Sequence, residues 1–490
     1  MKRWLFEHFA TGLALASCMF AGLSSLEGAT LRVRQDGTGN YTTIQACVNA
    51  MAGGDTCLVS AGTYPQRITF PSGKSGTASQ RTTIKAETPG TVDMLGFDTA
   101  NCNFLRIEGF NITVTNTQSG YPSVPGVDLR SSNLQIVSNY VHDIQYIALY
   151  GHGSCNSNYV AGNRIYNVGM GLIIHGTGWL VESNEIQRLQ YYSVLGDSDY
   201  VTFFGSYHVL RYNFLHGTSQ SEIGPSHVDG FTTYDNNNEA VQHIRIEGNR
   251  VQDFYHQGVL MAAQFYSNSF DVLICNNIFR QAASWGVDAF NGIRDVKIYH
   301  NLFMDINSVA VGINQGATGE CKNNIFYNVT SWDSATLPTI GGNNIWYRPG
   351  GSVGARFIGD LLNVNPQFVD VANGNYHLSS TSPARDAGVA LALVPSDLDN
   401  LARPQGTGWD IGPYEFVTSS PTARLLAPVR QGSNFVFTLS GGPGLNYRID
   451  ASSNLVQWSQ IKTVALVTGA AQFTNPATIA RRFYRSLWLP

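Results

Sequence analysis

The sequence contains little charge and very little lysine. Asp, Glu, Lys and Arg make up 13% of its 490 residues, and six of the 30 basic residues are lysine. Charged residues usually make up about a quarter of a globular chain, and exposed helices depend on Lys, Glu and Ala. The shortage disfavours a helical protein, and the 50 glycines favour strands joined by tight turns. No run of basic residues occurs and the net charge is -4, so we expect no nucleic-acid partner.

Clustered cysteines are also missing. The chain has 7 Cys but no Cys-x-x-Cys pair and no Cys/His cluster, so we expect no zinc site. Cys47 and Cys57 flank a short Gly-rich turn and would be able to pair in an oxidising compartment. We expect buried free thiols at the other four cysteines that follow the N-terminal segment: Cys102, Cys155, Cys275 and Cys321.

Long apolar runs are absent except at the N-terminus. Lys2 and Arg3 precede an apolar stretch over residues 9–23, which is typical of a signal peptide, here assigned to residues 1–29. About fifteen apolar residues are too few for a membrane span. Residues 15–18 also resemble a bacterial lipoprotein signal, which makes a lipid anchor at Cys18 an alternative. We expect a monomer that is secreted, periplasmic or on the cell surface, without a membrane span.

Asparagine, in contrast, recurs in a regular pattern. An aliphatic pair is followed by Asn every 20 to 36 residues, at Asn111, Asn139, Asn163, Asn184, Asn213, Asn249, Asn277, Asn301, Asn324 and Asn344. Such a period with short strands and turns predicts a solenoid, because one coil cannot bury its own apolar face. An inward Asn at the same turn of every coil would bond to the Asn above and below it.

Two segments carry a family resemblance. Residues 36–45, 54–59 and 61–64 resemble the opening of right-handed parallel β-helix proteins of the pectin-lyase-like superfamily, and residues 380–388 and 409–415 resemble the closing segment of its secreted bacterial members. The resemblance implies an all-β, right-handed parallel β-helix over residues 30–416. The superfamily includes lyases, hydrolases, esterases, epimerases and phage adhesins, so the fold alone does not give an activity.

Both ends of the solenoid have their own expected structure. Thr43 places a hydroxyl near the start of a short helix, which predicts an N-terminal cap. Residues 417–422 read as a linker, and alternating apolar residues over 423–490 predict a small β-sandwich-like domain.

Aligning one strand per coil predicts a row of outward side chains. Its members are Arg130, Tyr150, His175, Asp197, Tyr234, Ala262, Phe290 and Asn314. The matching inward row is Val127, Leu172, Val194, Phe231, Val259, Val287 and Val311. Since adjacent coils lie about 4.8 Å apart, the first five outward positions span enough length for several sugar rings.

Two long coils beside this row contain most of the remaining candidate groups. His216, Glu222, His227 and Asp229 lie within 14 residues. A His two residues before an Asp on an extended segment faces the same side, so Asp229 would orient His227. Residues 226–231 also resemble a signature of uncharacterised carbohydrate-active β-helix proteins. His208, at an inward position, is expected to be structural. The candidate catalytic residues are His227, Asp229, His175, Tyr234, Asp197 and Asp199, and the candidate substrate-binding residues are Arg130, Tyr150, Tyr200 and Glu222.

These groups favour a polysaccharide lyase acting on a uronate-containing glycan. Arg130 would neutralise the uronate carboxylate, and His175 or His227 would remove the adjacent proton. Tyr150 or Tyr234 would protonate the leaving oxygen. The resemblance also implies calcium-dependent lyases, but acidic residues cluster only at Asp197 and Asp199, so calcium is left open and no other cofactor is expected.

Three alternatives remain. A uronate epimerase would use nearly the same groups. A glycoside hydrolase would use Asp197 or Asp199 together with Asp229, since two carboxylates must flank the bond. A non-enzymatic glycan-binding solenoid would keep the outward row and tolerate loss of His227 and Asp229.

Overall fold

The computed structural model describes residues 28–113, 123–193, 195–234, 239–263, 268–330, 340–353, 357–417 and, with short gaps, 423–489. The signal peptide, Cys18, Val194 and most of the linker lie outside the described residues. Within the described part, no helix is long and apolar enough to cross a membrane.

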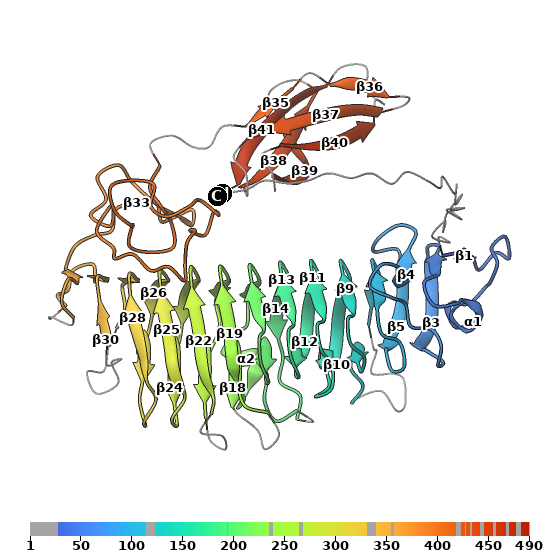
Figure 1. Ribbon diagram of the computed structural model, residues 1–490, viewed down its shortest axis with the longest axis horizontal. Coiled ribbons are helices and arrows are strands. Elements are labelled where there is room, and N and C mark those ends of the chain that lie inside the picture. Colours follow the sequence, from blue (N-terminus) through green and yellow to red (C-terminus); the bar gives the residue numbers. More distant parts are fainter. Residues whose placement is uncertain are drawn as a thin grey trace, which may run out of the picture.

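The chain forms a parallel β-solenoid, as the asparagine period predicts (Figure 1). The first sheet has 13 strands in sequence order: β1 (Thr30–Val33), β2 (Thr56–Val59), β4 (Thr82–Ala86), β6 (Leu105–Glu108), β9 (Gln135–Val137), β11 (Tyr159–Ala161), β13 (Leu180–Glu182), β16 (Val209–Arg211), β19 (Gln242–Glu247), β22 (Phe270–Cys275), β25 (Arg294–Tyr299), β28 (Gly319–Lys322) and β30 (Ile340–Gly342). Every neighbouring pair in this sheet is parallel.

Two further parallel sheets complete each coil. The second contains β3 (Gly62–Thr69), β5 (Val92–Asp98), β7 (Asn111–Ile112), β10 (Tyr140–Gly151), β12 (Arg164–Ile174), β14 (Glu185–Leu189), β17 (Phe214–His216), β20 (Arg250–Gln252), β23 (Ile278–Ala282), β26 (Leu302–Ile306), β29 (Ile325–Tyr327), β31 (Ile345–Tyr347) and β32 (Leu361–Leu362). The third contains β8 (Val127–Leu129), β15 (Val201–Phe203), β18 (Phe231–Tyr234), β21 (Val259–Ala262), β24 (Val287–Phe290) and β27 (Val311–Ile313). The long strands β5, β10 and β12 run through both sheets, so their C-terminal halves pair with the third.

The asparagines form a hydrogen-bonded ladder through the interior. From Asn139 to Asn344, each side-chain amide donates to the Oδ1 of the next asparagine over 2.9–3.1 Å, and the last donates to Asp360. The same Oδ1 atoms accept the backbone N–H of the preceding asparagine, so polar groups of each turn are satisfied without water. Asn111 is an exception to the prediction. Phe110 occupies its ladder position and donates its N–H to Asn139, while Asn111 bonds to Asp93 and His142.

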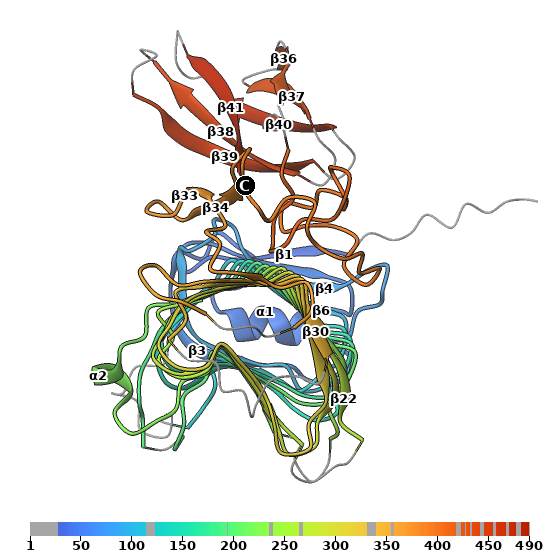
Figure 2. The same cartoon turned by 90° about the vertical axis from the view of Figure 1, so that its left-hand side faces the viewer.

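The N-terminal cap is confirmed. Helix α1 (Ile44–Ala50) lies across the first coils, and its N-cap Thr43 accepts a hydrogen bond from the backbone N–H of Ala46 (Figure 2). It buries Ile44, Cys47 and Val48 against the end of the core. Cys47 and Cys57 are free thiols, so the disulfide that their spacing allowed is not formed, and the other four cysteines are buried free thiols as expected.

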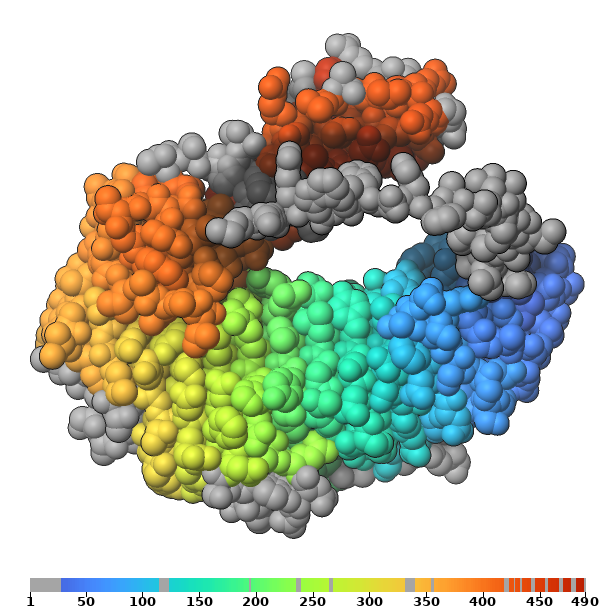
Figure 3. Space-filling view, viewed as in Figure 1, coloured from blue at the N-terminus to red at the C-terminus, as the bar shows by residue number. Residues whose placement is uncertain are grey.

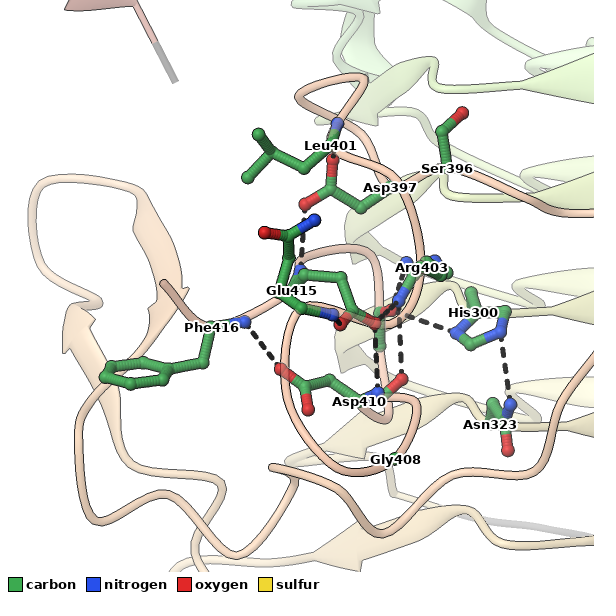
Figure 4. A network of polar contacts seen from close by, with 12 residues as sticks. His300, Asn323, Ser396, Asp397, Leu401, Arg403, Gly408, Asp410, Glu415 and Phe416 are labelled. Carbon is green, nitrogen blue, oxygen red and sulfur yellow. Dashed lines mark hydrogen bonds and ion pairs between the residues drawn. The ribbon is translucent and has the colours of Figure 1, made fainter. Parts of the chain in front are cut away.

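The closing segment, residues 380–416, folds back along the first sheet (Figure 3). The Arg403 side chain is completely buried and pairs with Glu415 at 2.7 Å (Figure 4). It also donates to Asn276 of the solenoid at 3.1 Å. The Asn323 side chain donates to the Val389 carbonyl and accepts from the Val389 N–H, and Arg245 donates to the Leu393 carbonyl. Side chains of three coils therefore hold the closing segment in place.

Beyond the solenoid, a short hairpin, β33 (Phe368–Asp370) and β34 (Asn375–Leu378), precedes two antiparallel sheets (Figure 1). One contains β35 (Arg424–Leu425), β36 (Val429–Gln431), β37 (Asn434–Ser440) and β40 (Ala470–Pro476), and the other contains β38 (Leu445–Ser452), β39 (Ser459–Leu466) and β41 (Phe483–Leu489). They share one apolar core, which includes Phe437, Tyr447 and Phe473, as expected of a small sandwich-like fold.

Candidate functional site

The third sheet carries most of the predicted site residues, and its register corrects the predicted outward row. Strand β15 starts at Val201, not near Ser193, because Val201 pairs with Leu172 and with Phe231. Phe204 therefore takes the place assigned to Asp197. In the neighbouring coil β10 continues to Gly151, so His152 takes the place assigned to Tyr150. The actual outer row is Arg130, His152, His175, Phe204, Tyr234, Ala262, Phe290 and Asn314.

Side chains of this row contact one another from coil to coil. The His175 ring stacks on Phe204 with centroids 4.5 Å apart, and Phe204 meets Tyr234 edge to face at 5.3 Å. Tyr150 belongs to a parallel row, where it pairs in register with Asp128 and Ile173, and its ring lies 4.5 Å from His152. The outer row is thus a partly aromatic surface whose side chains contact one another, and the sequence analysis likewise predicted a row of polar and aromatic side chains.

A groove of about 720 Å³ runs beside the N-terminal half of this row. It is lined by Tyr150, His152, Gly153, His175, Gly176, Gly205, Ser206, Glu239, Ala240, Gln242 and Asn268. Glycines in the lining leave room for the Glu239 carboxylate. A Cβ on Gly153 or Gly205 would lie within 3.0 Å of its oxygens.

Two imidazoles in the groove are each held by a carboxylate. His175 Nδ1 lies 3.3 Å from Glu239 Oε1, and Glu239 Oε2 accepts the backbone N–H of Gly176. One coil earlier, His152 Nε2 lies 2.6 Å from Asp128 Oδ1. A carboxylate bonded to one ring nitrogen fixes the tautomer and leaves the other nitrogen to accept or donate a proton. Burial alone would raise the pKa of Glu239, but the His175 and Gly176 hydrogen bonds outweigh burial and lower it.

Arg130 is less available than predicted. Its Nε atom lies 2.8 Å from Asp128 and 3.7 Å from Asp98. Its side chain is 47% exposed and therefore accessible to a substrate. A substrate carboxylate would nevertheless have to compete with two carboxylates of the protein.

A second cluster of titratable groups lies further along the same sheet. The rings of His227 and His256 are in contact, with centroids 4.0 Å apart and planes tilted by 41°, and His256 Nδ1 lies 3.6 Å from Asp229 Oδ1. The structure thus brings His227 and Asp229 together, as predicted, but the imidazole nearest to Asp229 belongs to His256. Asp197 and Asp199 also approach this cluster, since their charges act on Asp229 and Tyr234.

Burial dominates the electrostatics of this cluster. It raises the pKa of Asp229 to about 7, against hydrogen bonds from Gln257 N–H and the Thr232 hydroxyl. It also raises the pKa of Asp199 well above the ordinary range, helped by the charges of Asp229 and Asp197, and it raises the pKa of Asp197 against the attraction of His227. For His256, burial and then the neighbouring His227 lower the pKa to about 4.

Two predicted substrate-binding residues are corrected by the structure. Tyr200 is fully buried, and its hydroxyl bonds to Thr218 inside the coil at 2.5 Å. It precedes β15 and points inward, because the register of that coil differs from the predicted one. Glu222 caps helix α2 (Gln220–Ile223) through Ser219 and pairs with Arg188 at 2.5 Å, so its carboxylate is engaged within the protein.

Four residues of these clusters were missed by the sequence analysis: Asp128, His152, Glu239 and His256. Asp128 sits two residues before Arg130 on an outward position, which alternation along the strand would have revealed. His152, Glu239 and His256 follow strands or loops whose ends vary between coils, so no period marks them. His208 is structural, as predicted: it is buried and bonds to Trp179 N–H and Phe204 C=O.

No protein-family model and no curated protein sequence matches the chain. Among solved structures, it is similar to the A-module of the Azotobacter vinelandii mannuronan C-5 epimerase AlgE4 (16% identity, TM-score 0.41, covering 62% of this chain and 83% of that one). It is also similar to the PL6 family alginate lyase AlyGC (11% identity, TM-score 0.38, 66% and 48%) and to XylC in complex with xylose (10% identity, TM-score 0.43, 94% and 100%). The chain spans about half the length of the AlyGC structure. At these identities and TM-scores, the similarity carries no argument about the activity of this protein, which has to be argued from its own residues.

Proposed function

We propose that this protein is a polysaccharide-active enzyme, and that it is a lyase acting on a uronate-containing glycan in the groove beside the outer row. The observation that supports this proposal is the pair of carboxylate-held imidazoles, His175 with Glu239 and His152 with Asp128, on adjacent coils of one groove. Adjacent coils are about 4.8 Å apart, a separation that lets two proton-transfer groups act on neighbouring atoms of one sugar.

β-Elimination needs one group to remove a proton and another to supply one. In our proposal, His175 Nε2 takes the proton next to the uronate carboxyl group, because Glu239 occupies Nδ1 and stabilises the imidazolium that forms. The C–H electrons form the new double bond, and the bond to the glycosidic oxygen breaks. His152 or its neighbour Tyr150 gives that oxygen a proton, so atoms and charge balance. Arg130 lies at the end of the row, where it would face the carboxylate of the sugar.

A glycoside hydrolase is the second candidate. Burial raises the pKa of Asp197, which is partly exposed and lies beside His227, and a raised pKa is what a carboxylic general acid needs. Asp199 and Asp229 are less suitable partners, because both are buried and accept backbone N–H groups of the next coil.

The test is activity on a panel of uronic-acid and neutral polysaccharides. A lyase forms an unsaturated product that absorbs in the near ultraviolet, whereas a hydrolase forms reducing ends without this absorbance. We expect His175→Ala to lower kcat on the active polysaccharide by at least ~100-fold. Glu239→Gln should lower kcat by at least ~10-fold and change the pH profile, since Glu239 acts through His175.

His216→Ala is the matched control. His216 forms a similar pair with Glu185 at 3.0 Å, but on β17 of the second sheet, outside the groove. Its removal should leave kcat unchanged. Reducing ends without ultraviolet absorbance, or full activity of His175→Ala, would contradict the lyase proposal, and glycan binding without any product would favour a binding protein.

A further inference from the structure

We propose that His227, Asp229 and His256 form a binding site for one divalent transition-metal ion of the zinc type. Among the described residues, these side chains are the one group of three or more His, Cys, Asp or Glu residues whose potential ligand atoms lie close enough together to hold a metal ion. The site lies in the segments just before β18 and β21, separate from the His152 and His175 pairs, so the inference does not depend on the lyase proposal.

The distances suit a small cation. The three potential ligand atoms lie within 4.8 Å of one another, and the His256 Nδ1 to Asp229 Oδ1 distance is 3.6 Å. Ligand atoms about 2.0–2.2 Å from a tetrahedral zinc ion are about 3.3–3.6 Å apart. One edge of the site therefore already has the required length. His227 is exposed, so its ring is able to turn toward the other two ligands.

The Nδ1 atom of His256 lacks a hydrogen-bond partner, and a metal ion would supply one ligand bond to it. This nitrogen is buried and has no hydrogen-bond partner. A buried polar atom without a partner costs about 1–3 kcal/mol, and native proteins rarely leave one without a reason. His256 cannot easily move the nitrogen to solvent, because its backbone N–H is bonded to Val228 C=O at 3.0 Å and its ring is packed against His227.

Hydrogen bonds from neighbouring residues hold the Asp229 carboxylate in place. Oδ1 accepts the backbone N–H of Gln257 at 2.8 Å, and Oδ2 accepts the Thr232 hydroxyl at 3.1 Å. These bonds fix the carboxylate and leave a lone pair of Oδ1 directed at His256, 3.6 Å away. Outer hydrogen bonds of this kind orient metal-binding carboxylates.

The donor set selects the metal. Two imidazole nitrogens and one carboxylate oxygen suit zinc and neighbouring transition metals. Calcium requires six to eight oxygen ligands, which this group does not supply. Three protein ligands also leave a fourth position open, and the exposure of His227 places that position toward solvent. The metal would therefore be able to exchange a water molecule for a small anionic or carbonyl ligand.

The test measures metal binding and uses no activity. The full chain, without an affinity tag, is dialysed against a chelator and titrated with Zn²⁺ by calorimetry, with bound metal counted by elemental analysis. We expect one Zn²⁺ per chain, and Co²⁺ in its place should give the visible absorption of a tetrahedral site. His256→Ala and Asp229→Asn should each weaken binding by at least ~10-fold, and Ca²⁺ should not compete.

His243→Ala is the matched control, because His243 forms a comparable pair with Asp271 at 2.6 Å on the first sheet. It should bind Zn²⁺ like the parent chain. His227→Ala changes an exposed side chain, so it tests the site even if a change at buried Asp229 impairs folding. Less than one Zn²⁺ per chain, equal binding by Ca²⁺, or unchanged binding in both His227→Ala and His256→Ala would overturn the proposal.

Discussion

The carboxylate of Asp288, on the third sheet, is largely shielded from water, and this burial changes its pKa. Asp288 pairs in register with Leu260 and Gly312 on an outward row, yet burial raises its pKa to about 6, while Asn314 partly opposes the shift. An aspartate of an unfolded chain has a pKa near 3.8. The folded state therefore holds the proton of Asp288 more tightly than the unfolded state does.

This difference predicts how stability depends on pH. Because the folded pKa is the higher one, the penalty for Asp288 is absent below pH ~3.8, grows as pH rises toward 6, and is complete above 6. We expect Asp288→Asn to raise the free energy of unfolding by about 1 kcal/mol at pH 8, a value discounted for partial exposure, and to change it little at pH 3. Chemical denaturation at both pH values measures this effect. An equal gain at both pH values would contradict this explanation.

At the residue scale, the sequence identified chemistry better than position. Alternation along strands correctly placed Arg130, His175 and Tyr234 on one outward row. It misplaced Asp197 and Tyr200, because the loop before β15 has the same mixture of small and polar residues as a strand start. Nothing in a single sequence shows where such a loop ends. The contacts of His175 with Glu239, 64 positions later, depend on coil stacking and were likewise beyond the sequence.

At the scale of elements, the asparagine ladder is the feature that joins one coil to the next. Asn249 makes four of its bonds at once. Its Oδ1 accepts from the backbone and side chain of Asn213, and its Nδ2 donates to Leu210 C=O and to Asn277, all over 2.9–3.0 Å. The sequence period predicted the ladder because each coil must repeat the same turn, and it erred at Asn111, because Phe110 occupies the ladder position of that coil.

Breaking this ladder should be costly. Asn249→Ala removes one side chain but leaves several buried polar groups on both neighbouring coils without partners. Since each such group costs about 1–3 kcal/mol, we expect the free energy of unfolding to fall by at least ~3 kcal/mol. Asn111→Ala is the control outside the ladder and should cost less than ~1.5 kcal/mol. Urea denaturation measures the free energy of unfolding of both variants. A similar decrease for both would show that the ladder position does not make Asn249 more important than Asn111.

At the scale of the whole molecule, the closing segment contains one buried ion pair, and the arginine of that pair also bonds to the solenoid. Arg403 and Glu415 have no exposed side-chain surface (Figure 4). Arg403 also donates to Asn276 of the solenoid. The sequence predicted that residues 380–416 close the β-helix, from the resemblance alone. It did not predict that they run along the first sheet, because the partner asparagines are more than 60 positions away.

Removing one partner of this pair should loosen the segment. Arg403→Met leaves Glu415 as a buried unpaired charge, so we expect a loss of about 3–5 kcal/mol in the free energy of unfolding. Hydrogen exchange should rise first in the closing segment and in β22. The double change Arg403→Met with Glu415→Gln should recover part of the loss. Arg32→Met, which breaks an exposed pair with Glu87, should cost less than ~1 kcal/mol; a comparable cost for both arginines would refute the role given to Arg403.

The asparagine column also has a direction. Every ladder amide donates one N–H to the Oδ1 of the next coil toward the C-terminus, and the last of them donates to the carboxylate of Asp360. The other N–H donates to a backbone carbonyl of the preceding coil, as Asn249 does to Leu210. The aligned amide dipoles add up, so the column ends in a partial positive charge that an anion neutralises, much as an acidic residue does at the start of a helix. A coil inserted or removed anywhere before Asn344 would keep this polarity as long as it brought its own asparagine. Whole coils could therefore be added to or removed from the solenoid while Asp360 remains the acceptor at the end of the column.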